Sequence, residues 1–281
     1  MSAFHPLPLG RRIPDRPHAV SVSLPTMRDL IGYEEKDPAV VRHITLGYPR
    51  FVLHPCLRRL AACLAQQHHL AGQTLWLTAS GRSADELAAH LRKTPAARGA
   101  RLAVFSAAGL HGVVHPENPD LAGEAKAWLQ NTGTFLGSRE AEDALVRLGE
   151  LPHAEPEVLF SGDALGEIRR VLSRALPTAG AGDLLPACTG MNAIYAAFRA
   201  VSELQAARGR TIWVQLGWLY RDTIAILKRL TPDPARDYVH LPDVFNLAAL
   251  ERLCAEQGDR LGMVLGAEQV VGHRISLGAA G

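Results

Sequence analysis

The sequence has 281 residues, of which 47% are hydrophobic and 21% are charged, and its formal net charge is +2. This composition excludes a disordered chain and gives no reason to expect binding to nucleic acid or to an anionic membrane. No apolar run is long enough to span a bilayer, and the first 25 residues lack the apolar stretch of a secretion signal. The four cysteines show no CxxC spacing, which favours a reducing, cytoplasmic compartment.

Residues 1–70 are interpreted as an N-terminal arm followed by a first helix. The first 45 residues contain six prolines and little apolar periodicity, which predicts an extended arm without a core of its own. Leucines then recur on one side of residues 57–69, which predicts a helix.

Residues 71–156 show strand patterns alternating with helix patterns, and we interpret them as an inserted α/β segment. The expected strands cover residues 74–77, 101–105 and 112–115. One helix is expected to start after Ser83, which forms a capping-box pattern with Glu86. Two further helices are expected around residues 122–129 and 139–148. Two prolines within residues 151–156 indicate a boundary.

Residues 157–281 repeat the alternation more regularly. The expected strands cover residues 211–214, 238–241 and 261–265, and the expected helices residues 165–176, 190–209, 220–230 and 245–254. Short loops between them predict a mostly parallel sheet with helices on both faces. Ligands of such sheets bind beyond the carboxyl ends of the strands, where the turn at Gly190 and the turn at 215–218 should both lie.

The segment Cys188-Thr189-Gly190-Met191-Asn192-Ala193 carries the clearest chemical signal. A loop of small residues that opens a helix presents unpaired backbone N–H groups and the positive end of the helix dipole, and both favour a phosphate. Any turn from a strand into a helix can look similar, so this segment does not identify a ligand alone.

Three motifs together resemble one enzyme family. Tyr48-Pro49-Arg50-Phe51, followed by Pro55 and an apolar helix, resembles the Tyr-x-Arg-Tyr-Gly-Asn-Pro-Thr segment of the Cys/Met-metabolism enzymes that use pyridoxal phosphate, such as cystathionine gamma-synthase. The segment 189–194 resembles their Ser/Thr-Gly-Met-x-Ala-Ile phosphate loop, and 216–221 is similar to their Tyr-Gly-Gly-Thr-Tyr-Arg turn. The order of the three motifs is also that of the family.

The resemblance implies a fold-type-I transferase, with pyridoxal 5′-phosphate as its cofactor and a small amino acid as its substrate. It also implies a homodimer or homotetramer in which the arm reaches the cofactor of a neighbouring subunit. The family's ring-stacking tyrosine falls at Leu216, so Trp218 is the expected substitute, although packing at the strand end would also explain it. The cofactor-binding residues that follow are Tyr48, Arg50, Thr189, Gly190, Met191, Trp218 and Tyr220.

The chain departs from the family in two ways. First, 139 residues separate Arg50 from Gly190, far more than in the family, which is why 71–156 reads as an insertion. Second, the family's Asn-Pro turn, its pyridine-binding Asp and its Ser-x-x-Lys motif are missing, so no catalytic residue is identified. Each of the four lysines, at 36, 93, 126 and 228, reads as a surface residue. Residues 157–281 are therefore expected to be the front part of a cofactor domain, truncated before the catalytic lysine.

The leading functional hypothesis is γ-replacement on an activated homoserine, or a related C–S lyase reaction. Two alternatives remain: a truncated, non-catalytic relative and a Rossmann-like protein that binds a small molecule. A metal site is not expected, because the adjacent His68 and His69 would point apart on a helix and no third ligand is evident.

Overall fold

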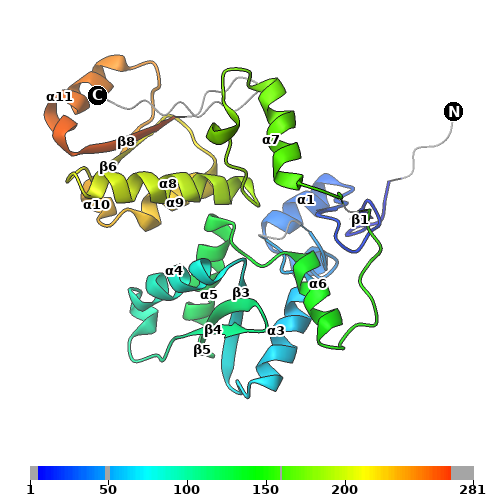
Figure 1. Ribbon diagram of the computed structural model, residues 1–281. Coiled ribbons are helices and arrows are strands. Elements are labelled where there is room, and N and C mark those ends of the chain that lie inside the picture. The colour runs from blue at the N-terminus through cyan, green and yellow to red at the C-terminus, as the bar shows by residue number, and fades with distance from the viewer. Residues whose placement is uncertain (1–5, 48–50, 159, 267–281) are drawn as a thin grey trace. The chain divides into compact units, whose positions relative to one another are not determined.

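A computed structural model describes residues 6–47, 51–158 and 160–266 (Figure 1). The chain is a mixed α/β protein with two compact units. Unit 1 comprises residues 1–130 and 134–161, and unit 2 comprises residues 131–133 and 162–281. The division of the sequence into an arm, an insertion and a cofactor domain stays a prediction.

The N-terminal arm contains more regular structure than its prolines suggested. Strand β1 (Arg12–Ile13) pairs antiparallel with β2 (Ser21–Val22), and helices α1 (Met27–Glu34) and α2 (Pro38–Val41) follow. Helix α1 begins with a capping box, because Thr26 accepts a bond from the Asp29 N–H and Asp29 accepts one from the Thr26 N–H. The expectation of an extended arm was therefore wrong for this stretch, because local capping stabilises a helix without a long apolar stripe.

The sheet of unit 1 is antiparallel. Its strands are β3 (Gln73–Thr78), β4 (Ala103–Ala107) and β5 (Leu110–Pro116), in the order β3-β5-β4. Ala108 and Gly109 join β4 to β5 as a two-residue turn with φ of 50° and 74°. Positive φ at both positions is what a tight hairpin requires, and it makes the two strands antiparallel neighbours.

Four helices of unit 1 accompany this sheet: α3 (Pro55–Gln67), α4 (Gly81–Arg92), α5 (Pro119–Thr132) and α6 (Ser138–Arg147). A core of leucines and small residues joins α3 and α6 to the sheet, with Leu60, Leu64 and Leu145 almost fully buried. The start of α4 differs from the sequence-based expectation. Its N-cap is Ser80, whose hydroxyl accepts the N–H of Ser83, so the helix begins before the expected capping box.

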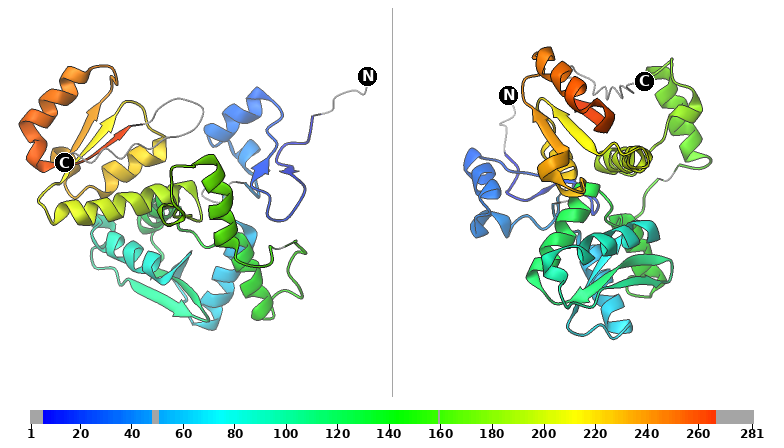
Figure 2. Two further views of the ribbon diagram at one scale, coloured as in Figure 1. Left: turned by 45° about the horizontal axis from the view of Figure 1, so that its top comes forward. Right: turned by 90° about the vertical axis from the view of Figure 1, so that its left-hand side faces the viewer.

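The sheet of unit 2 is parallel, as predicted. It consists of β6 (Ile212–Leu216), β7 (Tyr238–Leu241) and β8 (Leu261–Gly266), in the order β7-β6-β8. Helices α8 (Gly190–Ala206) and α9 (Arg221–Leu230) lie on one face of the sheet, and α11 (Leu247–Gln257) lies on the other (Figure 2). Right-handed crossovers explain this, because the chain steps from β6 to β7 and then back across β6 to β8.

A buried carboxylate fixes the amino ends of these strands. Asp237, which ends the short helix α10 (Pro234–Asp237), has a fully buried side chain that binds Arg236 at 2.7 Å and Arg260 at 2.6 Å. Hydrogen bonds from Arg236 and Thr211, with the charge of Arg260, lower the pKa of Asp237 to about 2. This cluster joins segments that enter all three strands.

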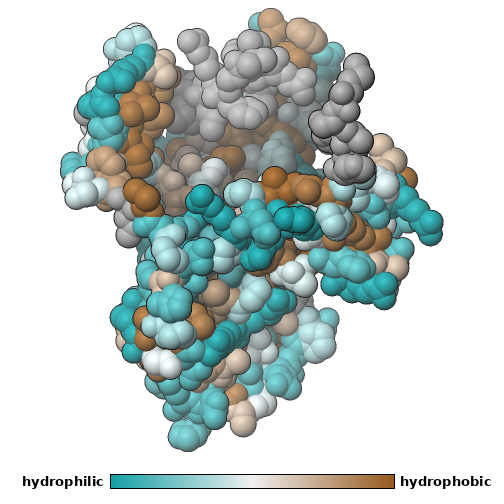
Figure 3. Space-filling view, turned by 90° about the vertical axis from the view of Figure 1, so that its right-hand side faces the viewer, coloured by the Kyte–Doolittle hydropathy of each residue, from teal (hydrophilic) through white to brown (hydrophobic). Residues whose placement is uncertain are grey.

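Helix α7 (Ala164–Ala175) buries none of its residues, and neither does α11. The apolar side chains of α7 remain exposed, and they include Leu165, Ile168, Val171 and Leu172. On the face of the protein that Figure 3 shows, brown apolar residues are exposed among teal hydrophilic residues. Within the described ranges, no helix has the length and apolar character needed to cross a membrane.

Candidate functional site

The start of helix α8 has the features of an anion-binding site. Thr189 is the N-cap, and its hydroxyl accepts the N–H of Asn192 at 3.0 Å. Within the part of the chain that the structure describes, the N–H groups of Gly190 and Met191 have no hydrogen-bond partner. Gly190 is exposed, and a side-chain carbon built on it would meet no atom within 4 Å. The N–H of Gly190, at the positive end of a long helix, is therefore open to a negatively charged ligand, whereas Met191 is 5% exposed.

The turn after β6 presents aromatic side chains to solvent. Gly217 has a φ of +70°, and the residues that follow alternate between the surface and the core. Leu219 is 4% exposed and anchors the turn, whereas Trp218 is 76% and Tyr220 is 55% exposed. An exposed tryptophan on an anchored turn offers a flat apolar surface to a ligand ring.

Both features belong to the carboxyl edge of the parallel sheet. Strand β6 ends at Leu216, directly before the turn. Helix α8 precedes β6 and packs back along the sheet, so its first residues lie toward the edge where β6 ends (Figure 1). This is the edge at which open α/β sheets bind ligands. That Thr189, Gly190, Met191, Trp218 and Tyr220 bind one cofactor stays a prediction.

Other expected groups have a different status. Tyr48 and Arg50 lie outside the described residues. All four lysines are exposed, and none lies in the turn after β6 or in the first turn of α8. No group of three or more metal-binding side chains gathers within the described ranges. The turns that the sequence placed at Gly190 and at 215–218 are present, whereas their contacts with a cofactor stay predictions and no reacting side chain was predicted.

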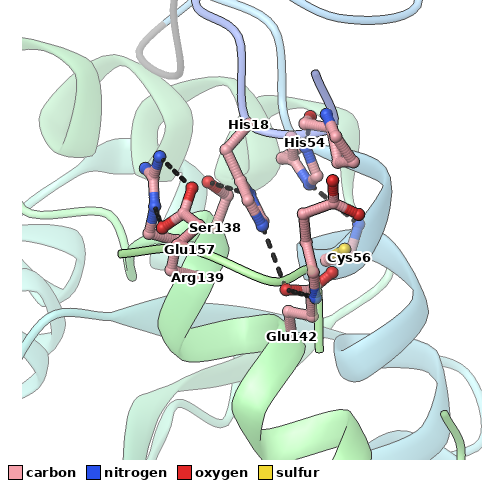
Figure 4. A network of polar contacts seen from close by, with 9 residues as sticks. His18, His54, Cys56, Ser138, Arg139, Glu142 and Glu157 are labelled. Atoms are coloured by element: carbon pink, nitrogen blue, oxygen red, sulfur yellow. Dashed lines mark hydrogen bonds and ion pairs between the residues drawn. The ribbon is translucent and has the colours of Figure 1, made fainter. Parts of the chain in front are cut away.

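A second polar network, in unit 1, was missed by the sequence analysis. His18 is buried between Ser138, whose hydroxyl lies 3.0 Å from Nδ1, and Glu142, whose carboxylate lies 3.1 Å from Nε2 (Figure 4). The ring of His18 also stacks on that of His54, the N-cap of α3. Since these residues are up to 124 positions apart, no local pattern could have grouped them.

Burial changes the titration of this network. Burial lowers the pKa of His54, and the nearby imidazole of His18 acts in the same direction. Burial also raises the pKa of Cys56, with Glu142 adding to the effect, so this thiol is not a reactive thiolate. The geometry supports a role in holding the arm against α3 and α6 rather than a chemical one.

Comparison with known proteins identifies the family. The chain is 39% identical over 256 residues to an L-2-amino-4-chloropent-4-enoate dechlorinase/desaturase from Streptantibioticus cattleyicolor, a match that covers 91% of this chain and 49% of that protein. A putative cystathionine gamma-synthase from Saccharomyces cerevisiae is 32% identical over 155 residues, 50% of this chain and 24% of its own length. The cystathionine gamma-synthase of Neurospora crassa is 45% identical over 64 residues, 22% of this chain and 10% of its own length.

This chain belongs to the cystathionine gamma-synthase-like family. Members of the family are enzymes that depend on pyridoxal phosphate, which is therefore the cofactor that the family assigns to this chain. The chain spans about half the length of the dechlorinase/desaturase and less of the other relatives. No family model matches the sequence. No solved structure matches it either.

The start of α8 fits the phosphate end of this cofactor. A phosphate binds at a helix N-terminus through unpaired backbone N–H groups, and a side-chain carbon at position 190 would meet no protein atom within 4 Å. The turn at Gly217 adds an exposed indole at the same edge of the sheet. The described residues therefore suit the phosphate and offer a surface for the ring.

Proposed function

We propose that this chain forms the phosphate-binding part of a pyridoxal-phosphate enzyme that releases or replaces a substituent on the γ-carbon of an amino acid. The match to the dechlorinase/desaturase, which extends over 91% of the chain, carries this proposal. The name of that relative places its chlorine on carbon 4 of a 2-amino acid, which is the γ-carbon. The cystathionine gamma-synthases name the same carbon.

The family resemblance favoured a homoserine derivative with sulfur chemistry, whereas the longer match favours a halide as the leaving group. The putative cystathionine gamma-synthase of yeast matches 50% of the chain and the cystathionine gamma-synthase of Neurospora 22%, against 91% for the dechlorinase/desaturase. We therefore place a γ-chloro amino acid first and an activated homoserine or cystathionine second. Release of chloride from a γ-chloro amino acid would support the first alternative. Formation of a thiol or a keto acid from cystathionine or an activated homoserine would support the second.

In this proposal unit 2 has a fold-type-I sheet, and the N–H groups of Gly190 and Met191 bind the cofactor phosphate. Thr189 keeps these donors aligned by capping the helix through the Asn192 N–H. Trp218 and Tyr220 border the ring, and Tyr48 and Arg50 reach the phosphate from a neighbouring subunit of a homodimer or homotetramer. The bound cofactor supplies an electron sink that stabilises negative charge on the substrate carbon beside its amino group.

We also place the protein in the cytoplasm. All four cysteines are unpaired, including the exposed Cys188 and Cys254, as expected in a reducing compartment.

Gly190 offers a direct test of the phosphate contact. It is the first residue of α8, and Thr189 before it has extended backbone angles of −146° and 160°. Proline is tolerated at this helix position and after such a residue, so Gly190→Pro removes one N–H donor without breaking the helix. Gly190→Ala adds a side-chain carbon but keeps the N–H, and it is the matched control. Pyridoxal phosphate binding can be followed by equilibrium dialysis.

We expect Gly190→Pro to weaken binding of the cofactor by about 1.5–3 kcal/mol relative to Gly190→Ala, the scale of a hydrogen bond to a charged group. Arg50→Ala should cause a loss of about the same size in the assembled oligomer. Equal affinities for Gly190→Pro and Gly190→Ala, with both variants folded, would show that the phosphate does not bind at the start of α8.

A further inference from the structure

A buried amide lies directly before the aromatic turn. Gln215 on β6 is 1% exposed, and the residues that precede it in the strand are buried and apolar. A buried amide is unfavourable unless both of its ends are hydrogen-bonded. Here its Nε2 donates to the carbonyl of Gly217 at 2.8 Å, and its Oε1 accepts the hydroxyl of Tyr238 on β7. Gln215 therefore links the turn to the neighbouring strand.

The carbonyl of Gly217 has a second donor. Nε2 of His240, also on β7, lies 3.2 Å from the same oxygen. The backbone at Gly217 is further restricted, because its φ is +70° and a side-chain carbon built there would lie 2.3 Å from Cγ1 of Val244. Two donors and a close contact thus select one conformation of the turn.

This conformation determines where the next side chain points. Leu219 is buried in the core, so the turn is held on both sides of Trp218, while the indole itself is 76% exposed. A held backbone that displays an exposed indole loses little conformational entropy when a flat ligand binds to the ring. A need for a rigid turn at this point explains why the amide of Gln215 is buried and hydrogen-bonded at both of its ends.

We infer that Gln215 is a positioning residue that fixes Trp218 as a stacking surface for the pyridine ring of the cofactor. The inference rests on the proposed function for the identity of the ring, and it adds Gln215, Tyr238 and His240 to the residues that shape the site. Gln215 itself does not touch the ring in this scheme. It acts through the carbonyl of Gly217.

The first test examines the turn without any ligand. Incorporation of fluorotryptophan, with assignment of the Trp218 resonance by Trp218→Phe, reports the environment of this one indole by fluorine NMR. Gln215→Met keeps the volume but removes both hydrogen bonds, and Tyr238→Phe is a milder variant that removes one. Gln205→Met is the matched control, because it makes the same change at a half-buried position near the end of α8. We expect the Trp218 resonance to shift or broaden in the first two variants and to stay unchanged in the control.

The second test separates the ring from the phosphate. Binding of pyridoxal phosphate and of inorganic phosphate is measured for the wild type, Gln215→Met, Trp218→Ala and the double variant. Stacking on an aromatic ring is worth a factor of roughly 3 to 10 in affinity. Gln215→Met should therefore weaken the binding of pyridoxal phosphate by about this factor and leave the binding of inorganic phosphate unchanged. In the Trp218→Ala background, Gln215→Met should cause no further loss of affinity.

Three outcomes would overturn the inference. An unchanged Trp218 resonance in both Gln215→Met and Tyr238→Phe would show that the amide does not fix the turn. Equal losses for pyridoxal phosphate and inorganic phosphate would show that the effect is not on the ring. A wild-type chain that binds neither ligand would instead contradict the proposed function, and the fluorine resonance would still decide whether Gln215 holds the turn.

Discussion

The imidazole rings of His18 and His54 are stacked in unit 1, with their centroids 5.3 Å apart and their planes 24° apart. Nδ1 of His54 accepts the N–H of Cys56, so Nε2 carries the proton and donates it to the carbonyl of Pro17 at 2.9 Å. His54 is therefore neutral in this arrangement. It caps α3 with one nitrogen and binds the N-terminal arm with the other.

Acid should loosen this contact. Burial and the neighbouring His18 lower the pKa of His54 below its usual value of 6.5. The unfolded chain then binds more protons than the folded one, so the stabilisation is complete above about pH 6.5 and is lost as the pH falls through the lowered pKa. Protonation of Nδ1 would also remove the cap of α3. We expect the urea midpoint of unit 1 to fall between about pH 7.5 and about pH 5.5.

The matched variant is His54→Asn, because asparagine caps a helix well but does not titrate. Its urea midpoint should change less over the same pH range than that of the wild type. A wild type and a variant with the same pH dependence would show that His54 does not control the response.

Asp237 predicts a second pH effect, in unit 2. Its pKa of about 2 in the folded chain lies below the value of about 3.9 expected when unfolded. The stabilisation is thus complete above about pH 4 and is lost as the pH falls from there through about 2. Near neutral pH, Asp237→Asn should destabilise unit 2 by about 2 kcal/mol, because two arginines lose a charged partner. Asp233→Asn is the control, since Asp233 is half-exposed and 3.8 Å from Arg236, and it should have little effect. Equal effects of the two substitutions on thermal unfolding would contradict the role given to burial.

Gly217 and Gly209 allow the crowding at the aromatic turn to be measured. Both have a positive φ, of 70° and 73°, but a side-chain carbon would lie 2.3 Å from Val244 at position 217 and would meet nothing within 4 Å at position 209. Gly209→Ala should cost about 1 kcal/mol from backbone strain alone. Gly217→Ala should cost at least about 1 kcal/mol more, and adding Val244→Ala should recover part of the difference. Thermal unfolding of the three variants measures this, and equal losses at both glycines would show that Val244 moves aside freely.

Much of unit 2 could be predicted because its signals are local. Short apolar strands alternate with amphipathic helices, and the handedness of the crossovers leaves few arrangements for them. The start of α8 could be predicted for the same reason, since a capping Thr189 followed by Gly190 is a feature of adjacent residues. The antiparallel sheet of unit 1 depended on one Ala108-Gly109 turn, which the sequence analysis did not use.

The rest depended on contacts between distant residues. His18 meets Ser138 and Glu142 only after the arm folds against α6, and a lone histidine has no periodicity that reveals its partner. Gln215 could not be assigned a role either, because a single polar residue at a strand end is compatible with solvent exposure. Its importance follows from burial and from the hydroxyl of Tyr238, 23 residues further along the chain.

The four lysines give the last prediction, because the family holds its cofactor through a lysine and the sequence predicts that none of these four has that role. Lys36, Lys93 and Lys126 are exposed in unit 1. Lys228 is in the last turn of α9, roughly 10 Å along the helix from the residue that follows the aromatic turn. Reduction with borohydride in the presence of pyridoxal phosphate, followed by peptide mass spectrometry, should therefore give no stoichiometric adduct at these four positions. Lysine-to-arginine variants at each position should bind the cofactor as the wild type does. A stoichiometric adduct at any of the four, lost in the matching arginine variant, would identify the reacting lysine and overturn their assignment to the surface.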